Sequence, residues 1–453
     1  MKFGPLRGFR DYLPPDAAAR ADLFWTLRQV ARRAGFAEVE TPSVEAFELF
    51  RVKSGTALLE QSFRFQDKGG REVTLIPENT PALARLVAQR AKGETWPVKW
   101  FSLPKLWRYE EPQSGRTREF SQCVLDIFGV PGIEAELDIL TTLNAMLSAV
   151  GLQGRFFFHI NDRRLMEGLA TSLGVGSPEA FFHLLDRRDK LSGEEFRTEL
   201  QGLGLSPEAR TRLEDLMPGT HQGLFGAEAA ELLDRLEATP GMSADGRKGA
   251  DSLRQILRLG ASMGLKEVLR LDITVVRGLA YYTSTVVEAF DRQGELRAVF
   301  GGGRYDHLVE LFGGPPTPAF GVAIGDQTLE LLLRAAGRWP MKGPRPQVYV
   351  AATPEIPLDR VLRIVHELRR RGLRSDWDLL RRSLSRQVRE ASHREAEFLV
   401  VLGPRELAAG QVGLKNMQTG QQESFAEGEL VPRLEAALQG GEAASGERTS
   451  SPP

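Results

Sequence analysis

The chain has 453 residues, of which 42% are hydrophobic and 26% charged, and its 59 Lys and Arg nearly balance its 60 Asp and Glu. This composition is typical of a folded protein of two or three domains; it excludes a disordered chain and leaves nucleic-acid binding to local basic patches. The single cysteine, Cys123, excludes a disulfide framework and a cysteine-based zinc site. We find no secretory signal and no membrane-spanning apolar run, and therefore expect a cytoplasmic protein.

Residues 1–162 predict the first part of a discontinuous domain. Apolar residues at helical spacing predict a helix over 15–35 that ends at a glycine. Segments rich in β-branched and aromatic residues predict strands, and a helical pattern lies between two of them. The strands are expected at 36–42, 73–77, 98–109 and 120–130, and the helix at 80–90.

The composition changes after residue 162. Residues 163–258 are rich in Leu, Ala, Glu and Arg at helical periods, which predicts a small helical insertion. Strand patterns return in residues 259–336, so this part is expected to resume the interrupted domain. Its predicted elements are strands at 268–276, 281–290 and 295–300, a glycine run at 301–303, and a strand followed by a helix at 320–336.

The remaining residues predict a second, smaller domain. Proline and glycine in residues 337–346 indicate a linker. Strand and helix patterns alternate over 347–438, which predicts a mostly parallel sheet with helices on its faces. The polar composition of residues 439–453 predicts a disordered tail.

Polar side chains interrupt two of the predicted strands, 98–109 and 120–130, which form an antiparallel hairpin around a basic loop. Because side chains alternate along a strand, Cys123 faces the core while Gln122 and Asp126 share the opposite face. Arg108 and Glu110 likewise share one face of the first strand. Such groups must pair or bind a polar ligand when buried. A salt bridge of Arg108 with Asp126 and a ligand site both remain open.

Two more groups of polar residues lie at predicted turns. Glu78 and Thr80 stand where a strand passes into a helix, although Thr80 also suits a plain helix N-cap. Arg277, Tyr281 and Tyr282 stand at a turn between strands, where tyrosines are usually packing residues.

The chain has no P-loop and no Rossmann fingerprint, and its six histidines show no metal-ligand spacing.

The last domain contains a local basic patch that the overall charge conceals. A solvated helix face would account for part of it. RNA backbone is the more natural partner, because clustered arginines neutralise phosphates. The patch consists of Arg369, Arg370, Arg371, Arg374, Arg381, Arg382, Arg386 and Arg389.

Together these segments resemble the histidyl-tRNA synthetases, a family of class II aminoacyl-tRNA synthetases, over nearly the whole chain. The resemblance implies an α+β fold with two domains, and a homodimer. The first is a class II catalytic domain on a six-stranded antiparallel sheet with a helical insertion, and the second is a C-terminal α/β anticodon-binding domain. The matching segments are Thr41-Pro42 (first class motif), 108–122 (second motif), 277–282 (histidine signature), 301–306 with 320–325 (the run into the third motif) and 378–387 (anticodon-binding domain).

The resemblance implies that the chain activates L-histidine with ATP to histidyl-adenylate and transfers histidine to the 3′ end of tRNA(His). Mg²⁺ would bridge the ATP phosphates without a dedicated metal site in the protein, and neither DNA nor a membrane is an expected partner. The implied catalytic residues are Arg108, at the α-phosphate, and Arg277.

The same resemblance implies the binding residues. The implied histidine contacts are Glu78, Thr80, Arg108, Gln122, Asp126, Arg277, Tyr281 and Tyr282. The implied ATP contacts are Arg108, Glu110 at the adenine amino group, Arg118, and Phe120 stacked on the adenine. The implied tRNA contacts are Gln113, Arg116, Arg381, Arg382 and Arg386.

Several positions depart from the family pattern, and two of them affect charged contacts. Thr328 stands where the third motif usually has an arginine near the ATP γ-phosphate, so that Arg304 or Arg118 would have to take its place. Glu111 replaces an arginine that in many members contacts the extra 5′ guanosine of the tRNA, although Gln113 remains.

A second function stays open beside the ligase. Regulatory paralogues in the ATP phosphoribosyltransferase system bind histidine and resemble the catalytic domain, but they do not charge tRNA. They usually lack the anticodon-binding domain and the catalytic arginine. Because both features are present in this sequence, the resemblance favours the ligase.

Overall fold

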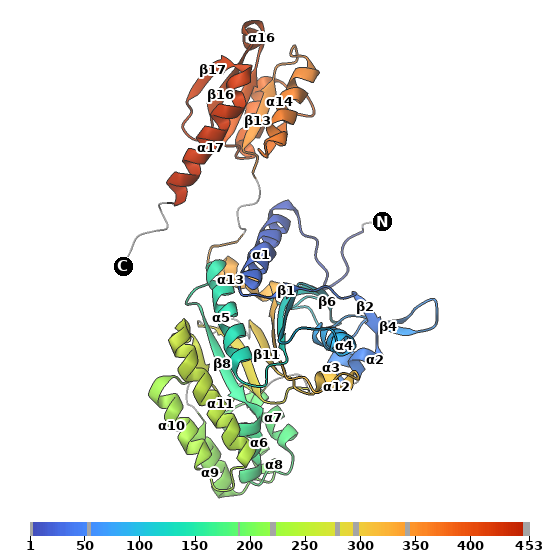
Figure 1. Ribbon diagram of the computed structural model, residues 1–453, viewed down its shortest axis with the longest axis vertical. Coiled ribbons are helices and arrows are strands. Elements are labelled where there is room, and N and C mark those ends of the chain that lie inside the picture. The colour runs from blue at the N-terminus through green and yellow to red at the C-terminus, as the bar shows by residue number, and fades with distance from the viewer. Residues whose placement is uncertain are drawn as a thin grey trace. The chain divides into compact units, whose positions relative to one another are not determined.

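The computed structural model describes residues 3–51, 56–188, 191–217, 223–276, 281–292, 299–339 and 345–446. The chain divides into two compact units, Met1–Met341 and Lys342–Pro453 (Figure 1). Among the described residues, no helix is long and apolar enough to cross a membrane.

A nine-stranded sheet forms the centre of the first unit. Its six middle strands, β5-β7-β12-β11-β10-β8, pair with one another in antiparallel order, which confirms the predicted six-stranded antiparallel sheet. Short parallel strands, β1 and β9, flank them, and β6 pairs with β7 alone. The strands are β1 (Ala37–Glu38), β5 (Val98–Ser102), β6 (Lys105–Trp107), β7 (Glu119–Phe128), β8 (Phe156–Asp162), β9 (Leu269–Leu271), β10 (Thr285–Asp291), β11 (Phe300–Arg304) and β12 (Ala319–Gly325).

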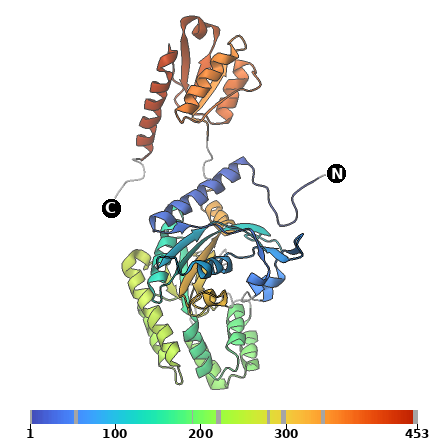
Figure 2. The same cartoon turned by 45° about the vertical axis from the view of Figure 1, so that its right-hand side comes forward.

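The main core lies between one face of this sheet and three helices, α1 (Pro14–Arg33), α5 (Glu134–Ala149) and α11 (Ala244–Gly260) (Figures 1 and 2). Cys123 belongs to this core together with the residues that alternate with it on β7, as the period of the strand predicts. The opposite face of β7 therefore carries Gln122, and the candidate site is found on that side.

Two helices pack over part of the opposite face, α4 (Thr80–Arg90) and α12 (Leu308–Leu311). A three-stranded antiparallel sheet, β2-β4-β3, adjoins them and carries the segment that leads into α4. Outside the helical insertion, the other elements of the first unit are β2 (Val44–Ala46), α2 (Glu48–Arg51), α3 (Thr56–Glu60), β3 (Arg64–Gln66), β4 (Glu72–Leu75) and α13 (Asp326–Ala335).

Two strand predictions need correction. The predicted strand 98–109 is broken between β5 and β6 at Pro104, which has no N–H for a ladder hydrogen bond. Arg108 and Glu110 therefore follow a strand and do not share a strand face. The glycine run at 301–303 does not follow a strand but lies within β11. A Cβ atom on Gly302 would lie 2.1 Å from the carbonyl oxygen of Gly321 on β12, so only glycine fits between these strands.

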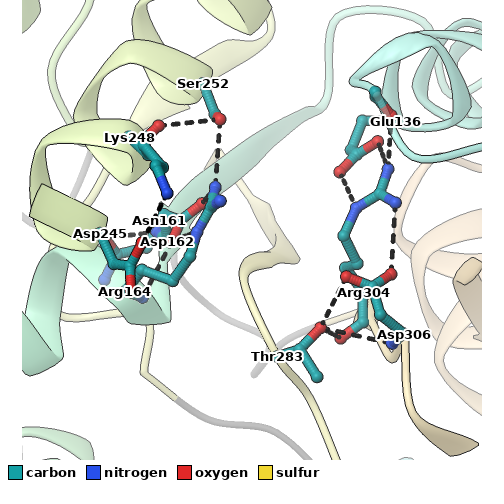
Figure 3. A network of polar contacts seen from close by, with 11 residues as sticks. Glu136, Asn161, Asp162, Arg164, Asp245, Lys248, Ser252, Thr283, Arg304 and Asp306 are labelled. Carbon is teal, nitrogen blue, oxygen red and sulfur yellow. Dashed lines mark hydrogen bonds and ion pairs between the residues drawn. The ribbon is translucent and has the colours of Figure 1, made fainter. Parts of the chain in front are cut away.

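Residues 163–258 are mainly helical. Four of the helices begin at a serine whose side chain accepts a hydrogen bond from the backbone N–H three residues later. Asp162 caps α6 in a related way, and Arg164 reaches Ser252 on α11 at 3.1 Å, which ties the end of β8 to that helix (Figure 3). The segments are α6 (Arg163–Ser172), α7 (Pro178–Arg187), α8 (Gly193–Gly202), α9 (Pro207–Leu216), α10 (Gly226–Glu237), α11 and the π-helix Ala261–Leu265.

The second unit has its own five-stranded sheet, β14-β13-β15-β16-β17, and its own apolar core. β14, β13 and β15 are parallel as predicted, but β16 and β17 are antiparallel, so the sheet is mixed. α17 continues through Gly446, past residue 439, the predicted start of a disordered tail. The elements are β13 (Val348–Ala352), α14 (Leu358–Arg370), β14 (Ser375–Trp377), α15 (Leu384–His393), β15 (Phe398–Leu402), α16 (Pro404–Ala409), β16 (Gln411–Asn416), β17 (Gln422–Ala426), the 3₁₀ turn Glu427–Glu429 and α17 (Leu430–Gly446).

Candidate active site

A cavity of about 470 Å³ opens on the sheet face opposite the main core. The hairpin loop after β6, the starts of α4 and α13, and strands β7, β10, β11 and β12 all contribute to its wall. Most of the predicted site residues meet here although they lie far apart in the sequence. Those that line the cavity are Glu78, Thr80, Arg108, Glu110, Arg116, Phe120, Gln122, Tyr281 and Tyr282.

Arg108 follows directly after β6 and is fixed by its surroundings. Its Nε donates a hydrogen bond to the carbonyl oxygen of Pro77 at 2.9 Å, and its guanidinium lies over the ring of Phe120 at 5.3 Å. Burial lowers the pKa of Arg108, and the carboxylates of Glu78 and Glu110 oppose that change. No salt bridge joins Arg108 to Asp126, so the structure rules out that pairing of the two residues.

The segment before α4 presents a buried carboxylate to the cavity. Tyr281 donates a hydrogen bond to Oε2 of Glu78 at 2.8 Å, and both side chains are buried. Burial, followed by the charge of Glu78, raises the pKa of Tyr281. Asn79, rather than Thr80, is the N-cap residue of α4, and its side chain bonds Thr41 and Ser102. The N-cap interpretation of Thr80 is therefore wrong, because Thr80 lines the cavity from the first helical position.

Three tyrosines form one wall, and sequence reasoning identified only two of them. Tyr281 packs edge-on against Tyr282 and Tyr305, with ring centroids 5.3 and 5.9 Å apart. The hydroxyl of Tyr305 donates a hydrogen bond to Oδ1 of Asp126. Tyr305 lies in the segment 301–306 that carries the family resemblance, but no pattern in the sequence marked its side chain. Tyr305 lines the cavity, whereas Asp126 does not.

Asp126 is fully buried and does not line the cavity. Its Oδ2 has no hydrogen-bond partner among the described residues. Burial raises the pKa of Asp126 to about 7, although the hydrogen bond from Tyr305 opposes the rise. A Cβ atom on Gly321 would lie 2.1 Å from Oδ1 of Asp126, so a glycine opposite this carboxyl group is required. Asp126, a predicted histidine contact, thus lies behind Tyr305, which lines the cavity.

The hairpin loop brings one predicted tRNA-contacting arginine into the cavity. Arg116 lines the wall and pairs with Glu110 at 3.2 Å. Gln113 pairs with Arg116 through backbone hydrogen bonds and does not line the cavity. Arg118 also lies away from the cavity, because its guanidinium stacks over Tyr109 at 3.7 Å. Among the described lining residues, Arg108 and Arg116 are the cations.

The structure shows where Thr328 and Glu111, the two residues that depart from the family pattern in a charged contact, lie. Thr328 lines the cavity from the first turn of α13. Arg304 cannot substitute for the missing arginine, because it is buried and held by Glu136 and Asp306 (Figure 3). Glu111 forms an exposed ion pair with Arg7. Arg277 lies outside the described residues.

The remaining predicted residues lie in the second unit. The side chain of Arg381 donates hydrogen bonds to the carbonyl oxygens of Pro354 and Ile356, and Arg382 pairs with Asp378 and Glu390. Together with Arg386, Arg389 and His393, Arg382 lines a hollow of about 430 Å³ on α15. In the described part of the chain, no group of three or more His, Cys, Asp or Glu residues is arranged to hold a metal ion.

Each of the two units matches a protein-family model. The family model described as "Histidyl-tRNA synthetase" matches residues 8–329, and the model described as "Anticodon binding domain" matches residues 347–437. A histidine–tRNA ligase of Thermoplasma volcanium is 38% identical over 442 residues, which cover 96% of this chain and 99% of the relative.

Solved structures share the fold. The crystal structure of histidyl-tRNA synthetase from Nostoc sp. PCC 7120 aligns with a TM-score of 0.82 at 25% identity, covering 96% of this chain and 100% of that chain. A structure named as an ATP phosphoribosyltransferase regulatory subunit/histidyl-tRNA synthetase from Bacillus halodurans aligns with a TM-score of 0.72 at 21% identity, covering 88% of this chain and 97% of that chain, and shows likeness in fold alone.

Proposed function

The chain belongs to the histidyl-tRNA synthetase family, and on this premise we propose that it is an ATP-dependent, AMP-forming histidine–tRNA ligase whose cavity activates L-histidine. The observation that carries the proposal is the meeting of Glu78, Arg108, Gln122 and Tyr282 in one cavity. An anionic side chain, a permanent cation and neutral hydrogen-bonding groups together suit an amino acid beside a nucleotide. No geometric feature favours the regulatory function over the ligase.

The histidine substrate is held between the start of α4 and the tyrosine wall. Glu78 binds its ammonium group, and the hydrogen bond from Tyr281 at 2.8 Å keeps this carboxylate in place. Gln122 and Tyr282 border the imidazole. Tyr305 adds a hydroxyl that Asp126 orients from behind, which supports a role for Asp126 through Tyr305.

In the first step, an oxygen of the histidine carboxylate attacks the α-phosphorus of ATP, the bond to the bridging oxygen breaks, and pyrophosphate leaves. Negative charge develops on the phosphate oxygens, so positioning and fixed positive charge provide most of the catalysis. Arg108 provides that charge because its planar guanidinium is fixed by Pro77 and lies over Phe120. Phe120 stacks on the adenine.

Arg116 is the other described cation on the cavity wall, and we assign to it the phosphate contact for which Thr328 has no charge. Glu110, its ion-pair partner, contacts the adenine amino group. Arg277, the additional arginine of the family signature, has its proposed catalytic role from the sequence resemblance.

Mg²⁺ fits the donor groups of the cavity. Glu110 and Glu288 line it, and carboxylate oxygens are ligands that Mg²⁺ accepts. Glu288 would supply a protein ligand, because Glu110 is assigned to the adenine amino group, and phosphate oxygens and water would supply the others. When bound, the ion neutralises charge on the phosphates.

In the second step, the terminal ribose hydroxyl of tRNA(His) attacks the activated carbonyl, and AMP leaves. The match of residues 347–437 to an anticodon-binding model supports tRNA as the acceptor.

We further propose a cytoplasmic homodimer. Exposed Pro42 and Val44, at the first class motif and on β2, support a dimer contact there.

The decisive experiment is histidine-dependent exchange of pyrophosphate into ATP. The wild-type chain should catalyse it, and Arg108→Ala should lower kcat/KM by about a hundredfold to a thousandfold, the effect of removing one donor to a developing oxyanion. Arg90→Ala is the matched control, because Arg90 pairs with Glu94 on the surface of the same unit. Histidine binding by the wild-type chain without any exchange would contradict the ligase and favour the regulatory function.

A further inference from the structure

The residues on either side of Tyr305 hold the segment that carries the other two tyrosines of the cavity wall. Tyr305 lies between Arg304, the last residue of β11, and Asp306. The N–H of Thr283, the residue after Tyr282, donates a hydrogen bond to the carbonyl oxygen of Arg304 at 2.7 Å. The two segments that form the tyrosine wall are therefore joined through their backbones.

The side chain of Thr283 adds a second link between the same two segments (Figure 3). Its hydroxyl oxygen lies 3.2 Å from the carbonyl oxygen of Arg304, 3.3 Å from Oδ2 of Asp306 and 3.4 Å from the backbone nitrogen of Asp306. The other carboxylate oxygen of Asp306 accepts a hydrogen bond from the N–H of Ala319 on β12 at 3.2 Å. Asp306 therefore connects the tyrosine segment with the strand beside β11.

Arg304 anchors this arrangement to the chain that follows β7. Its side chain is buried, and Nη1 and Nη2 donate hydrogen bonds to the carbonyl oxygens of Val130 and Gly132 at 2.8 and 2.6 Å. Its Nε donates to Oε1 of Glu136 on α5 at 2.8 Å, and Asp306 pairs with Nη1 at 3.4 Å. A buried cation is stable only when it is paired and hydrogen-bonded in this way. Arg304 therefore has an anchoring role.

Tyr282 depends on this arrangement for its position. A Cβ atom on Gly303 would lie 2.9 Å from Cδ2 of Tyr282, so the tyrosine ring lies directly against the backbone of β11. A carboxyl group holds the hydroxyls of Tyr281 and Tyr305, whereas no described residue holds the hydroxyl of Tyr282. The ring of Tyr282 is therefore placed by β11 and by its neighbour Thr283, and its hydroxyl is available to a substrate.

We propose that Thr283 and Asp306, anchored by Arg304, are positioning residues for the histidine side of the cavity. They hold the Tyr282 hydroxyl in place relative to β7, which carries Gln122, so that both groups meet the imidazole together. A hydrogen bond weakens steeply when its donor and acceptor lose their alignment. A small displacement of the tyrosine wall should therefore reduce the affinity for histidine. The proposal rests on the proposed function, since it concerns the same cavity.

Thr283→Val is the first test, because valine has the shape of threonine without its hydroxyl. The KM for histidine in pyrophosphate exchange should rise roughly fivefold to tenfold, the effect of one weakened hydrogen bond. The KM for ATP should change by less than about twofold, because the proposed phosphate contacts come from the hairpin loop, which these bonds do not reach. Thr283→Ser keeps the hydroxyl and should have the wild-type KM for histidine.

Thr142→Val is the matched control. Thr142 is buried in α5 of the same unit, and its hydroxyl donates a hydrogen bond to the carbonyl oxygen of Asp138 in the same helix at 2.8 Å. Its loss should leave both KM values unchanged, whatever it does to thermal stability.

The second test is a double-mutant cycle. In a Tyr282→Phe chain, which lacks the hydroxyl to be positioned, Thr283→Val should raise the KM for histidine by less than about twofold. Asp306→Ala should raise this KM at least as much as Thr283→Val does in the wild-type chain. The double variant of Asp306 and Thr283 should be no worse than Asp306→Ala alone, because both side chains act through one contact.

Three results would overturn the proposal: an unchanged KM for histidine in Thr283→Val, equal increases of both KM values, or an undiminished effect of Thr283→Val in the Tyr282→Phe chain. Calorimetric titration with histidine alone repeats the comparison without catalysis, and the Kd should rise for Thr283→Val but not for Thr142→Val. A wild-type chain that binds histidine without pyrophosphate exchange would contradict the ligase function, while the titration would still decide the positioning role.

Discussion

At the residue scale, Asp126 illustrates how burial sets the chemistry of a side chain. Its carboxyl group is enclosed by Tyr305 and the β12 backbone, and one oxygen has no partner among the described residues. An ionised carboxylate in such a place lacks the hydrogen bonds that would stabilise its charge. The protonated form therefore has the advantage in the folded protein, and this explains why its pKa rises to about 7.

The pKa of Asp126 predicts a pH dependence of stability. The folded pKa of about 7 exceeds the ordinary value of 3.8, so the folded state binds the extra proton between about pH 4 and pH 7. The stability of the first unit should fall as pH rises through that window, by about 1 kcal/mol per pH unit. Asp126→Asn keeps the shape of the protonated acid and should remove this slope.

Thermal unfolding of both proteins at pH 5 and pH 8 measures the effect. The unfolding temperature of the variant minus that of the wild type should be clearly larger at pH 8 than at pH 5. Parallel curves for the two proteins would show that Asp126 is ionised throughout and that the proposed environment is wrong.

At the element scale, the N-terminal segment (residues 3–13) joins the two elements that surround the nucleotide side of the cavity. The carbonyl oxygen of Gly8 accepts a hydrogen bond from the N–H of Arg118 at 2.7 Å, which holds the hairpin loop. The hydroxyl of Tyr12 accepts one from Gln327 at 2.7 Å, which holds the start of α13. Both contacted elements contribute residues to the cavity wall, so the segment positions the proposed ATP site.

Gly8→Ala should therefore impair ATP use. Gly8 has a φ of 84°, and a Cβ atom there would lie 2.7 Å from Cγ of Arg118, so alanine displaces the segment or the loop. We expect the KM for ATP in pyrophosphate exchange to rise about tenfold, which corresponds to roughly 1.4 kcal/mol, with little change in the KM for histidine.

Gly4→Ala serves as the control, because a Cβ atom on Gly4 would meet nothing within 4 Å. Equal increases in both KM values for Gly8→Ala would indicate a general loss of structure and would remove the argument for a positioning role.

At the scale of the whole molecule, the two units have separate cores and separate proposed tasks. The cavity is built from residues of the first unit alone, whereas the arginine-lined hollow belongs to the second. The first unit therefore contains the described residues proposed for adenylate formation. The second is proposed to add a binding surface for the tRNA, and linked binding sites raise affinity through effective concentration.

A chain that ends at Met341 tests this division. It should retain histidine-dependent pyrophosphate exchange within about twofold, while charging of tRNA(His) at low tRNA concentration should fall by roughly a hundredfold or more, as expected when one of two linked binding modules is lost. Circular dichroism would confirm that the shortened chain is folded. Undiminished charging by the folded, shortened chain would show that the second unit does not bind the tRNA.

The sequence by itself determined what depends on local spacing and on motifs. Period two placed Cys123 in the core and Gln122 on the cavity face, and the family motifs identified Glu78, Arg108 and Tyr282 as residues that meet in one cavity. The resemblance that these motifs carry also implied the six antiparallel strands.

The tertiary structure alone decided which charged side chains bind other groups of the protein and not a ligand. Arg304 is held by Glu136, 168 residues away, Arg118 by the ring of Tyr109, and Arg381 by carbonyl groups after β13. The position of Tyr305 on the cavity wall was likewise decided by the tertiary structure. Sequence composition and residue spacing do not distinguish an arginine that binds a phosphate from one that anchors a loop. Only the groups that folding brings beside each arginine distinguish the two.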